Sequence, residues 1–369
     1  MNSSIEALAE ISRYYGVNPD YVIAGGGNTS FKDKETLYVK ASGTALADAV
    51  PEAFVRMDRG ALGRIWEKSY PTESAAREKA VLEDLLAARK AGEEQKRPSV
   101  ETMLHDILPF DFVVHTHPAL VNGLTCSVRG QAAMEEIFAG EAIWIPSSNP
   151  GYILSLKVKK ALEEYAAKNG RPARIIFLQN HGVFAGADSV EGIREIYADL
   201  MDRLEKKIQR NPDFGAETRE APWGFLSALS EISGARAAFL CNNEIAKLVK
   251  DRASFYPVSS AFTPDHIVYA GSDPLFTEAQ SETAGREDLK NHVAKTGLPP
   301  KIAAIRGIGV FGIGVTEKAA ALALELFKDA VRVAVYSGSF GGPQFMGRDE
   351  INFINNWEVE AFRSKVSMK

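Results

Sequence analysis

The sequence contains very little cysteine. Cys126 and Cys241 are the only two cysteines among 369 residues. Two are too few for a disulfide framework, and their wide spacing does not suit a zinc site made of cysteine pairs. Such a composition fits a reducing compartment, and we therefore expect a cytoplasmic protein.

Long apolar runs are missing as well. No run approaches the roughly 20 residues that a membrane helix needs. The first 16 residues mix Glu6, Glu10 and Arg13 with apolar residues, a pattern typical of a short amphipathic helix rather than of a signal peptide. The sequence therefore predicts no association with a membrane.

An excess of positive charge is also absent. The formal net charge is -5, and no basic stripe stands out that would neutralise phosphates, so we expect no nucleic-acid partner. No GxGxxG motif opens a helix, and the Gly-Lys-Ser/Thr of a Walker loop is missing. The common dinucleotide and nucleoside triphosphate sites are therefore not predicted.

The sequence does have an ordinary globular composition, with 45% hydrophobic and 25% charged residues. A chain of this length is long for a single hydrophobic core, so two domains are expected. Short apolar segments such as residues 54–57 and 142–146 alternate with helix-like segments such as residues 73–91 and 153–168. This alternation predicts an α/β fold.

Two of the six histidines stand close together at the end of an apolar strand. His115 and His117 follow the apolar residues 112–114, and residues at i and i+2 of a strand point to the same face. Two neighbouring imidazoles can hold a divalent transition metal, although a catalytic zinc needs a third protein ligand. They can equally be buried histidines that bond to backbone groups.

A third histidine is found at the tip of a predicted hairpin. His181 lies between the apolar segments 174–178 and 183–186, which read as two strands joined by a tight turn. Two histidines on a strand end and one in a turn give a facial set of three nitrogens with an open position for substrate. The three together predict a metal centre.

A carboxylate lies upstream of the first histidine pair. Glu101 stands near the start of a predicted helix, residues 97–108, where an acidic residue already complements the helix dipole. Only one helix and one strand separate it from His115, so the fold can return it to the metal. His105, one turn further along the helix, is read as a surface residue or a residue behind the ligands.

Two loops rich in glycine and hydroxyl or amide side chains flank the predicted strand 36–40. They span residues 25–30 and 41–44. Their backbone amides can cradle an anion, while each loop alone is also compatible with a plain turn.

Taken in order, the segments 27–30, 42–43, 98–101, 115–118 and 180–182 resemble the class II aldolase/adducin family. This family includes fuculose-phosphate and rhamnulose-phosphate aldolases and ribulose-phosphate epimerases. The resemblance covers roughly residues 4–210. It implies an α/β/α sandwich with a mainly antiparallel central sheet.

The resemblance also implies a role for each site residue. His115, His117 and His181 would bind zinc or another divalent transition metal, and Glu101 would be the catalytic acid/base. The residues expected to bind a substrate phosphate are Gly27, Asn28, Ser42, Gly43 and Ser99. Family aldolases often carry two serines before the glutamate, whereas Val100 follows Ser99 here. Lys40 is the residue that can compensate.

By this resemblance the protein is a zinc-dependent aldolase. It would cleave a ketose, such as rhamnulose 1-phosphate or fuculose 1-phosphate, to dihydroxyacetone phosphate and an aldehyde by retro-aldol chemistry. One alternative is a pentulose-phosphate 4-epimerase using the same step, although family epimerases carry aspartate in place of Glu101. Another is a non-catalytic adducin-like module, which a complete histidine set disfavours. The expected partners are a small sugar or sugar phosphate and other copies of the chain, a tetramer by analogy with the family.

The last third of the chain is predicted to be a second domain. Residues 1–210 form the zinc domain, 211–223 a linker, and 224–369 a degenerate α/β repeat without metal ligands. Residues 301–314 echo 174–187 and also precede a long helix, and Ile308 falls where His181 falls. This part resembles the region after the aldolase domain in long bacterial aldolases fused to a lactaldehyde dehydrogenase. Within it, 267–269 reads as a strand, and 263–266 is a candidate for reaching an active site, its own or that of a neighbouring subunit.

Overall fold

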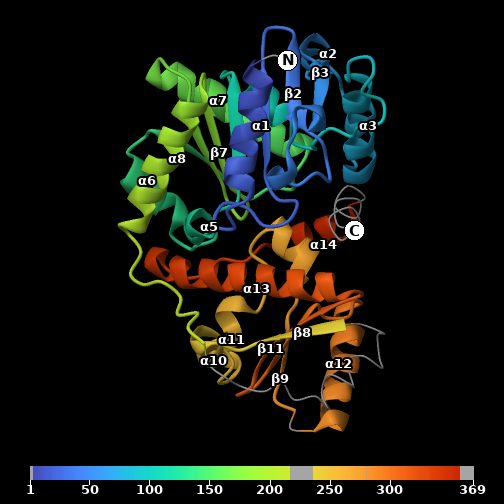
Figure 1. The fold of residues 1–369 in the computed structure, drawn as a ribbon, viewed down its shortest axis with the longest axis vertical. Coiled ribbons are helices and arrows are strands. Elements are labelled where there is room, and N and C mark those ends of the chain that lie inside the picture. Colours follow the sequence, from blue (N-terminus) through green and yellow to red (C-terminus); the bar gives the residue numbers. More distant parts are fainter. Residues whose placement is uncertain (1–2, 217–235, 280, 358–369) are drawn as a thin grey trace.

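The computed structural model describes residues 3–216, 236–279 and 281–357. Two sheets with their helices form two halves of the molecule, and the long helix α13 (Glu317–Ser337) runs between them (Figure 1). The predicted linker 211–223 lies only partly within the described residues. None of the helices in the described ranges combines the length and apolarity needed to cross a membrane.

The first sheet has seven strands in the order β3-β2-β1-β4-β7-β6-β5. Every neighbouring pair is antiparallel except β5 and β6, which are parallel. The prediction of a mainly antiparallel sheet is therefore confirmed. The strands are β1 (Asn28–Lys32), β2 (Thr36–Lys40), β3 (Phe54–Asp58), β4 (Phe112–Thr116), β5 (Ala142–Ile145), β6 (Ile175–Leu178) and β7 (Gly182–Ala187).

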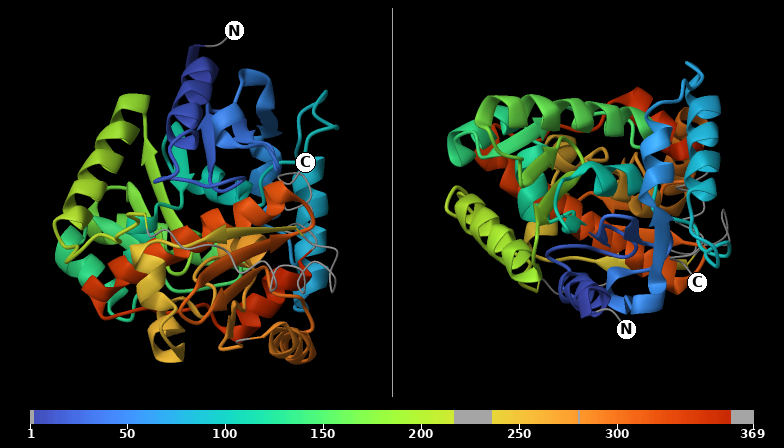
Figure 2. Two further views of the ribbon diagram at one scale, coloured as in Figure 1. Left: turned by 60° about the horizontal axis from the view of Figure 1, so that its bottom comes forward. Right: turned by 90° about the horizontal axis from the view of Figure 1, so that it is seen from above.

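Helices cover both faces of this sheet, as expected for an α/β/α sandwich (Figure 2). The helices are α1 (Ser3–Gly16), α2 (Arg59–Ile65), α3 (Ser74–Ala87), α4 (Thr102–Ile107), α5 (Ala119–Thr125), α6 (Gly130–Phe138), α7 (Tyr152–Asn169) and α8 (Val190–Glu205). Val114 of β4 packs with α1, α5, α6 and α8, while its neighbour Val113 packs with α4 and α7. Successive side chains of a strand point to opposite faces, so a strand covered on both sides must be apolar throughout.

The second sheet has four strands, β8 (Arg236–Leu240), β9 (Leu275–Thr277), β10 (Ile302–Ile305) and β11 (Gly309–Gly314), in the order β8-β11-β10-β9. Its pairings are antiparallel, antiparallel and parallel, which is also the pattern of β4-β7-β6-β5 in the first sheet. In both sheets the hairpin leads into a long helix, α8 or α13. This agreement supports the predicted internal repeat.

The remaining helical segments are mostly short. They are α10 (Asn243–Leu248), α11 (Arg252–Phe255), α12 (Glu282–Thr296), α14 (Arg348–Asn356), the 3-10 turns Leu46–Asp48, Pro51–Ala53, Tyr256–Val258 and Gly338–Phe340, and a π-helix, His266–Ala270.

Two predictions of local structure are wrong. The predicted strand 267–269 is part of the π-helix, because a short apolar run that is buried all round carries no period to separate a strand from a helix. The helix predicted for residues 97–108 begins only at Thr102, so that Glu101 is its N-cap residue. The Ser99 hydroxyl accepts a hydrogen bond from the Glu101 amide at 3.2 Å and holds this bend.

One apolar cluster joins the two halves. It combines Ala119 and Cys126 at the ends of α5 with residues of α13 and of the second sheet. The helices α5 and α13 approach so closely that a Cβ atom on Gly123 would lie 2.4 Å from the Cβ atom of Tyr336. Only glycine fits here without a shift of one helix.

Gly123→Ala is expected to lower the free energy of unfolding by about 1–3 kcal/mol, because the added methyl group overpacks the α5–α13 contact. Denaturant titration followed by circular dichroism measures this change. Gly63→Ala in α2 is the matched control, since a Cβ atom there meets nothing within 4 Å and alanine favours the helix by up to about 1 kcal/mol. Equal unfolding midpoints for Gly123→Ala and the wild-type protein would contradict the close approach.

Candidate metal centre and substrate cavity

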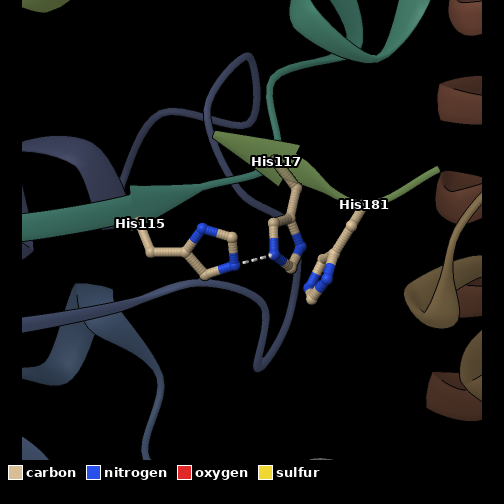
Figure 3. A group of neighbouring side chains, drawn as sticks. All are labelled: His115, His117 and His181. Atoms are coloured by element: carbon tan, nitrogen blue, oxygen red, sulfur yellow. Dashed lines mark hydrogen bonds between the residues drawn. The ribbon is translucent and has the colours of Figure 1, made fainter. Parts of the chain in front are cut away.

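The three predicted histidines meet at one end of the first sheet. His115 lies on the central strand β4, paired with Asn28 of β1 on one side and Phe184 of β7 on the other. His117 comes directly after β4, and His181 stands in the turn between β6 and β7. Because β7 pairs with β4, the β6–β7 turn with His181 lies next to the end of β4, where His115 and His117 stand (Figure 3).

The rings lie close enough to share one ion. Each of the three offers a nitrogen, and these nitrogens lie within 4.8 Å of one another. The Nε2 atoms of His115 and His117 are only 2.9 Å apart, the contact dashed in Figure 3. The ring of His115 also stacks on Phe184, with 4.0 Å between centroids, which fixes its plane.

Hydrogen bonds on the far side of two rings decide which nitrogen carries the proton. His115 Nδ1 lies 2.9 Å from the carbonyl oxygen of Val183, and His117 Nδ1 lies 2.6 Å from a carboxylate oxygen of Asp265. Because these oxygens accept, both Nδ1 atoms donate, and in neutral rings both Nε2 atoms then present lone pairs. Two lone pairs at 2.9 Å repel each other unless a proton or a cation lies between them.

Burial keeps the ring of His181 neutral. Burial lowers the pKa of His181 to about 3, so at neutral pH its imidazole carries no charge and keeps a lone pair. Its Nε2 atom lies 3.6 Å from Oε1 of Glu101, and the Nε2 atom of His115 lies 3.5 Å from the same oxygen. Among the described residues, that oxygen is buried and has no hydrogen-bond partner.

This donor set fits a divalent transition metal. Three imidazole nitrogens and a carboxylate oxygen converge, and that oxygen finds no N–H or O–H donor in the part of the chain that the structure describes. A buried acceptor without a partner is costly, and zinc held by the three imidazoles alone would keep a fourth position open for substrate beside this oxygen. The geometry supports the predicted ligands His115, His117 and His181.

Glu101 is held by a chain of buried polar groups. Its other oxygen, Oε2, accepts a hydrogen bond from Nδ2 of Asn28 at 2.5 Å, and Oδ1 of Asn28 in turn faces Nε2 of His105. Ser30 Oγ lies 2.7 Å from Nδ1 of His105. Burial lowers the pKa of His105 well below its ordinary value, so the neutral ring donates from one nitrogen and accepts at the other.

The sequence predicts His105 either on the surface or behind the ligands, and only the second position agrees with the structure. His105 is fully buried and orients Asn28, which in turn orients Glu101. The available signal was its position four residues after Glu101, on the same face of α4.

A small cavity adjoins the metal centre. It is lined by Gly25, Gly27, Asn28, Lys40, Ala41, Ser42, Gly43, Ser99, Val100, Glu101 and His117. All six residues predicted to bind phosphate are therefore gathered beside the carboxylate and one of the ligands. Lys40 is buried, and its Nζ atom donates to the carbonyl oxygen of Thr44 at 2.5 Å. Val100, which stands where family aldolases often carry a second serine, also lines this cavity.

Comparisons with known proteins agree with this layout. Residues 6–201 match the profile of the Class II Aldolase and Adducin N-terminal domain. A curated relative from Bacillus subtilis (strain 168), named Uncharacterized oxidoreductase YuxG, is 22% identical in an alignment 411 positions long that covers 97% of this chain. The chain spans 58% of the length of that relative.

Similar solved structures include a class II aldolase domain and an L-fuculose-1-phosphate aldolase. The N-terminal class II aldolase domain of a conserved protein from Thermoplasma acidophilum is 26% identical, covers 56% of this chain and 94% of that one, and has a TM-score of 0.47. An L-fuculose-1-phosphate aldolase from Thermus thermophilus is 19% identical, covers 56% and 92%, and has a TM-score of 0.35. Since the family profile spans more than half of the sequence, this chain belongs to the class II aldolase and adducin family.

Proposed function

We propose that this protein is a zinc-dependent aldolase that cleaves a ketose 1-phosphate to dihydroxyacetone phosphate and an aldehyde. Rhamnulose 1-phosphate and fuculose 1-phosphate are the leading candidates. The observation that carries the proposal is the buried Oε1 atom of Glu101, which faces His115 and His181 and has no hydrogen-bond partner among the described residues. It lies next to a cavity that contains a buried lysine, Lys40.

The reaction breaks the bond between C3 and C4 of the ketose, which leaves an electron pair at C3 beside the C2 carbonyl group. Zinc held by the three histidines would supply a Lewis acid that stabilises negative charge on the substrate's oxygens. As the bond breaks, the C4 hydroxyl group loses its proton and becomes the aldehyde carbonyl group, while C3 must gain a proton. Glu101, as the general acid/base, takes up the proton released at C4 and delivers a proton to C3 as the dihydroxyacetone phosphate forms. Since Asn28 occupies Oε2, the oxygen left to move this proton is Oε1.

The glycine- and serine-containing loops of the cavity would hold the phosphate. Ser42, Ser99 and Lys40 line the same cavity as Glu101. An anion bound there fixes one end of the substrate, so that its reacting carbon is oriented toward the carboxylate. Lys40 supplies the positive charge that a second serine would not.

Lys40→Met is expected to raise KM for the phosphorylated ketose about 10- to 100-fold, the loss typical of a hydrogen bond to a charged group. Steady-state kinetics with the phosphorylated and the unphosphorylated sugar measure the difference. Lys90→Met is the matched control, because Lys90 donates to Thr36 at the far end of the same strand, β2. A KM that rises equally for both sugars would argue against a phosphate contact.

The proposed activity is tested by a screen of the zinc-loaded protein against ketose 1-phosphates. Release of dihydroxyacetone phosphate and epimerisation of pentulose phosphates are followed in parallel. Cleavage of one ketose phosphate, lost on chelation and restored by zinc, is the expected result. Epimerisation without release of a triose phosphate would assign the retro-aldol step to an epimerase instead.

We further propose that residues 224–369 are a degenerate repeat of the first domain and that the protein forms a homo-oligomer. The shared pairing pattern of the two sheets supports the first proposal. The turn of the second hairpin carries Ile308 where the first carries His181, so the repeat has lost this ligand. Light scattering of the purified protein would give the number of subunits.

A further inference from the structure

A carboxylate from the second half of the chain reaches the metal centre. Oδ2 of Asp265 lies 2.6 Å from Nδ1 of His117, and both side chains are buried. The two residues are 148 positions apart in the sequence. We propose that Asp265 is a positioning residue that sets the tautomer and the ring orientation of His117, so that the second half of the chain completes the metal site.

This inference rests on the proposed metal-binding function and adds a residue to it. A ligating histidine whose second nitrogen donates to a carboxylate is fixed in one tautomer and becomes a stronger base. With its Nδ1 proton directed to Asp265, His117 keeps Nε2 as the atom that faces His115. The same bond prevents the ring from turning away from the site.

The segment that carries Asp265 also lies against α13. Asp265 directly precedes the π-helix His266–Ala270, a rare conformation that occurs often at functional sites. The Thr263 hydroxyl lies 2.9 Å from Nδ1 of His266, and Nε2 of His266 lies 3.2 Å from a carboxylate oxygen of Asp329 on α13. His266 therefore places the segment next to the helix that runs between the two halves.

The first half of the chain also forms hydrogen bonds with the residues just before Asp265. Nδ2 of Asn180 donates to the carbonyl oxygens of Phe262, at 3.1 Å, and of Gln344, at 2.8 Å. Asn180 is the residue before the ligand His181, and Cys126 also donates to Phe262 at 3.6 Å. The segment that carries Asp265 is therefore bound by Asn180, the residue next to the predicted ligand His181.

The glycine loop leaves room for the pair. A Cβ atom on Gly26 would lie 2.7 Å from Oδ2 of Asp265 and 3.3 Å from Nδ1 of His117. Three segments distant in the sequence thus meet at one hydrogen bond, and a side chain on the loop would displace it. This close approach provides a second way to disturb the bond without removing the carboxylate.

The test measures metal affinity rather than turnover. Asp265→Asn keeps the size of the side chain and removes its charge, and zinc affinity is determined by competition with a chromophoric chelator. The variant is expected to bind zinc about 10- to 100-fold more weakly than the wild-type protein. The visible absorption spectrum of the cobalt-loaded protein should also change, because the ligand field of His117 changes.

Glu244→Gln is the matched control. Glu244 is a buried carboxylate of the second half that pairs with Arg210 at 2.8 Å, so the substitution removes the same charge away from the metal. Its zinc affinity and cobalt spectrum should equal those of the wild-type protein. Gly26→Ala, which crowds Asp265 while keeping its charge, should weaken zinc binding as Asp265→Asn does, and it serves if Asp265→Asn fails to fold.

The outcomes separate this inference from the proposed function. A wild-type protein that binds no zinc would remove the metal centre and with it the whole proposal. A wild-type protein that binds one zinc per chain, with Asp265→Asn and Gly26→Ala equal to Glu244→Gln in affinity and spectrum, would leave the metal centre intact and overturn the role of Asp265.

Discussion

Glu101→Gln is expected to lower kcat by about 10²- to 10⁴-fold while the protein keeps its zinc. This is the range that a positioned general acid/base contributes. The carboxamide can still accept a hydrogen bond from Asn28, but it has no proton to exchange at the position of Oε1. The three imidazoles are unchanged, so metal binding should survive.

The measurement pairs turnover with metal content for the same preparation. Asp106→Asn is a suitable control, since Asp106 lies on α4, the helix that Glu101 caps, and pairs with Arg59 at 2.6 Å instead of facing the histidines. It should retain the wild-type kcat. A zinc-loaded Glu101→Gln protein that turns over at the wild-type rate would exclude Glu101 from the reaction.

The parts of the site that lie close together in sequence were predictable. The spacing of His115 and His117 places both rings at the end of one strand. The apolar segments on either side of His181 predict a hairpin with this histidine at its tip. In both cases local periodicity and turn chemistry determine the geometry, and both are written in a few consecutive residues.

The parts that depend on distant pairings were not predictable from local pattern. Asn28 lies beside His115 only because β1 pairs with β4, and no local feature of either segment states this register. The sequence indicates only that residues 263–266, which include Asp265, are a candidate for reaching an active site. It does not say whether this site belongs to the same chain or to a neighbouring subunit. The local pattern predicts a strand at residues 267–269, within the π-helix that Asp265 precedes, because all five residues of this helix are buried and show no periodicity.

His181→Ala is expected to strip the metal from the protein, so that purified chains contain little or no zinc. A catalytic zinc typically needs three protein ligands, and the loss of one leaves only His115 and His117. Turnover should fall at least as far as in Glu101→Gln, because the Lewis acid is lost together with the ion. Elemental analysis of the purified variant measures the zinc directly.

The fold should tolerate this change, which makes the result interpretable. The backbone of the β6–β7 turn is held by Asn180, whose amide group donates to the carbonyl oxygens of Phe262 and Gln344 independently of the His181 ring. His292→Ala is the control, because His292 is a half-buried histidine on α12, outside the metal centre. It should keep one zinc per chain. If His181→Ala also kept one zinc per chain, the ion would have to be held without the turn, and the third ligand would belong to another residue.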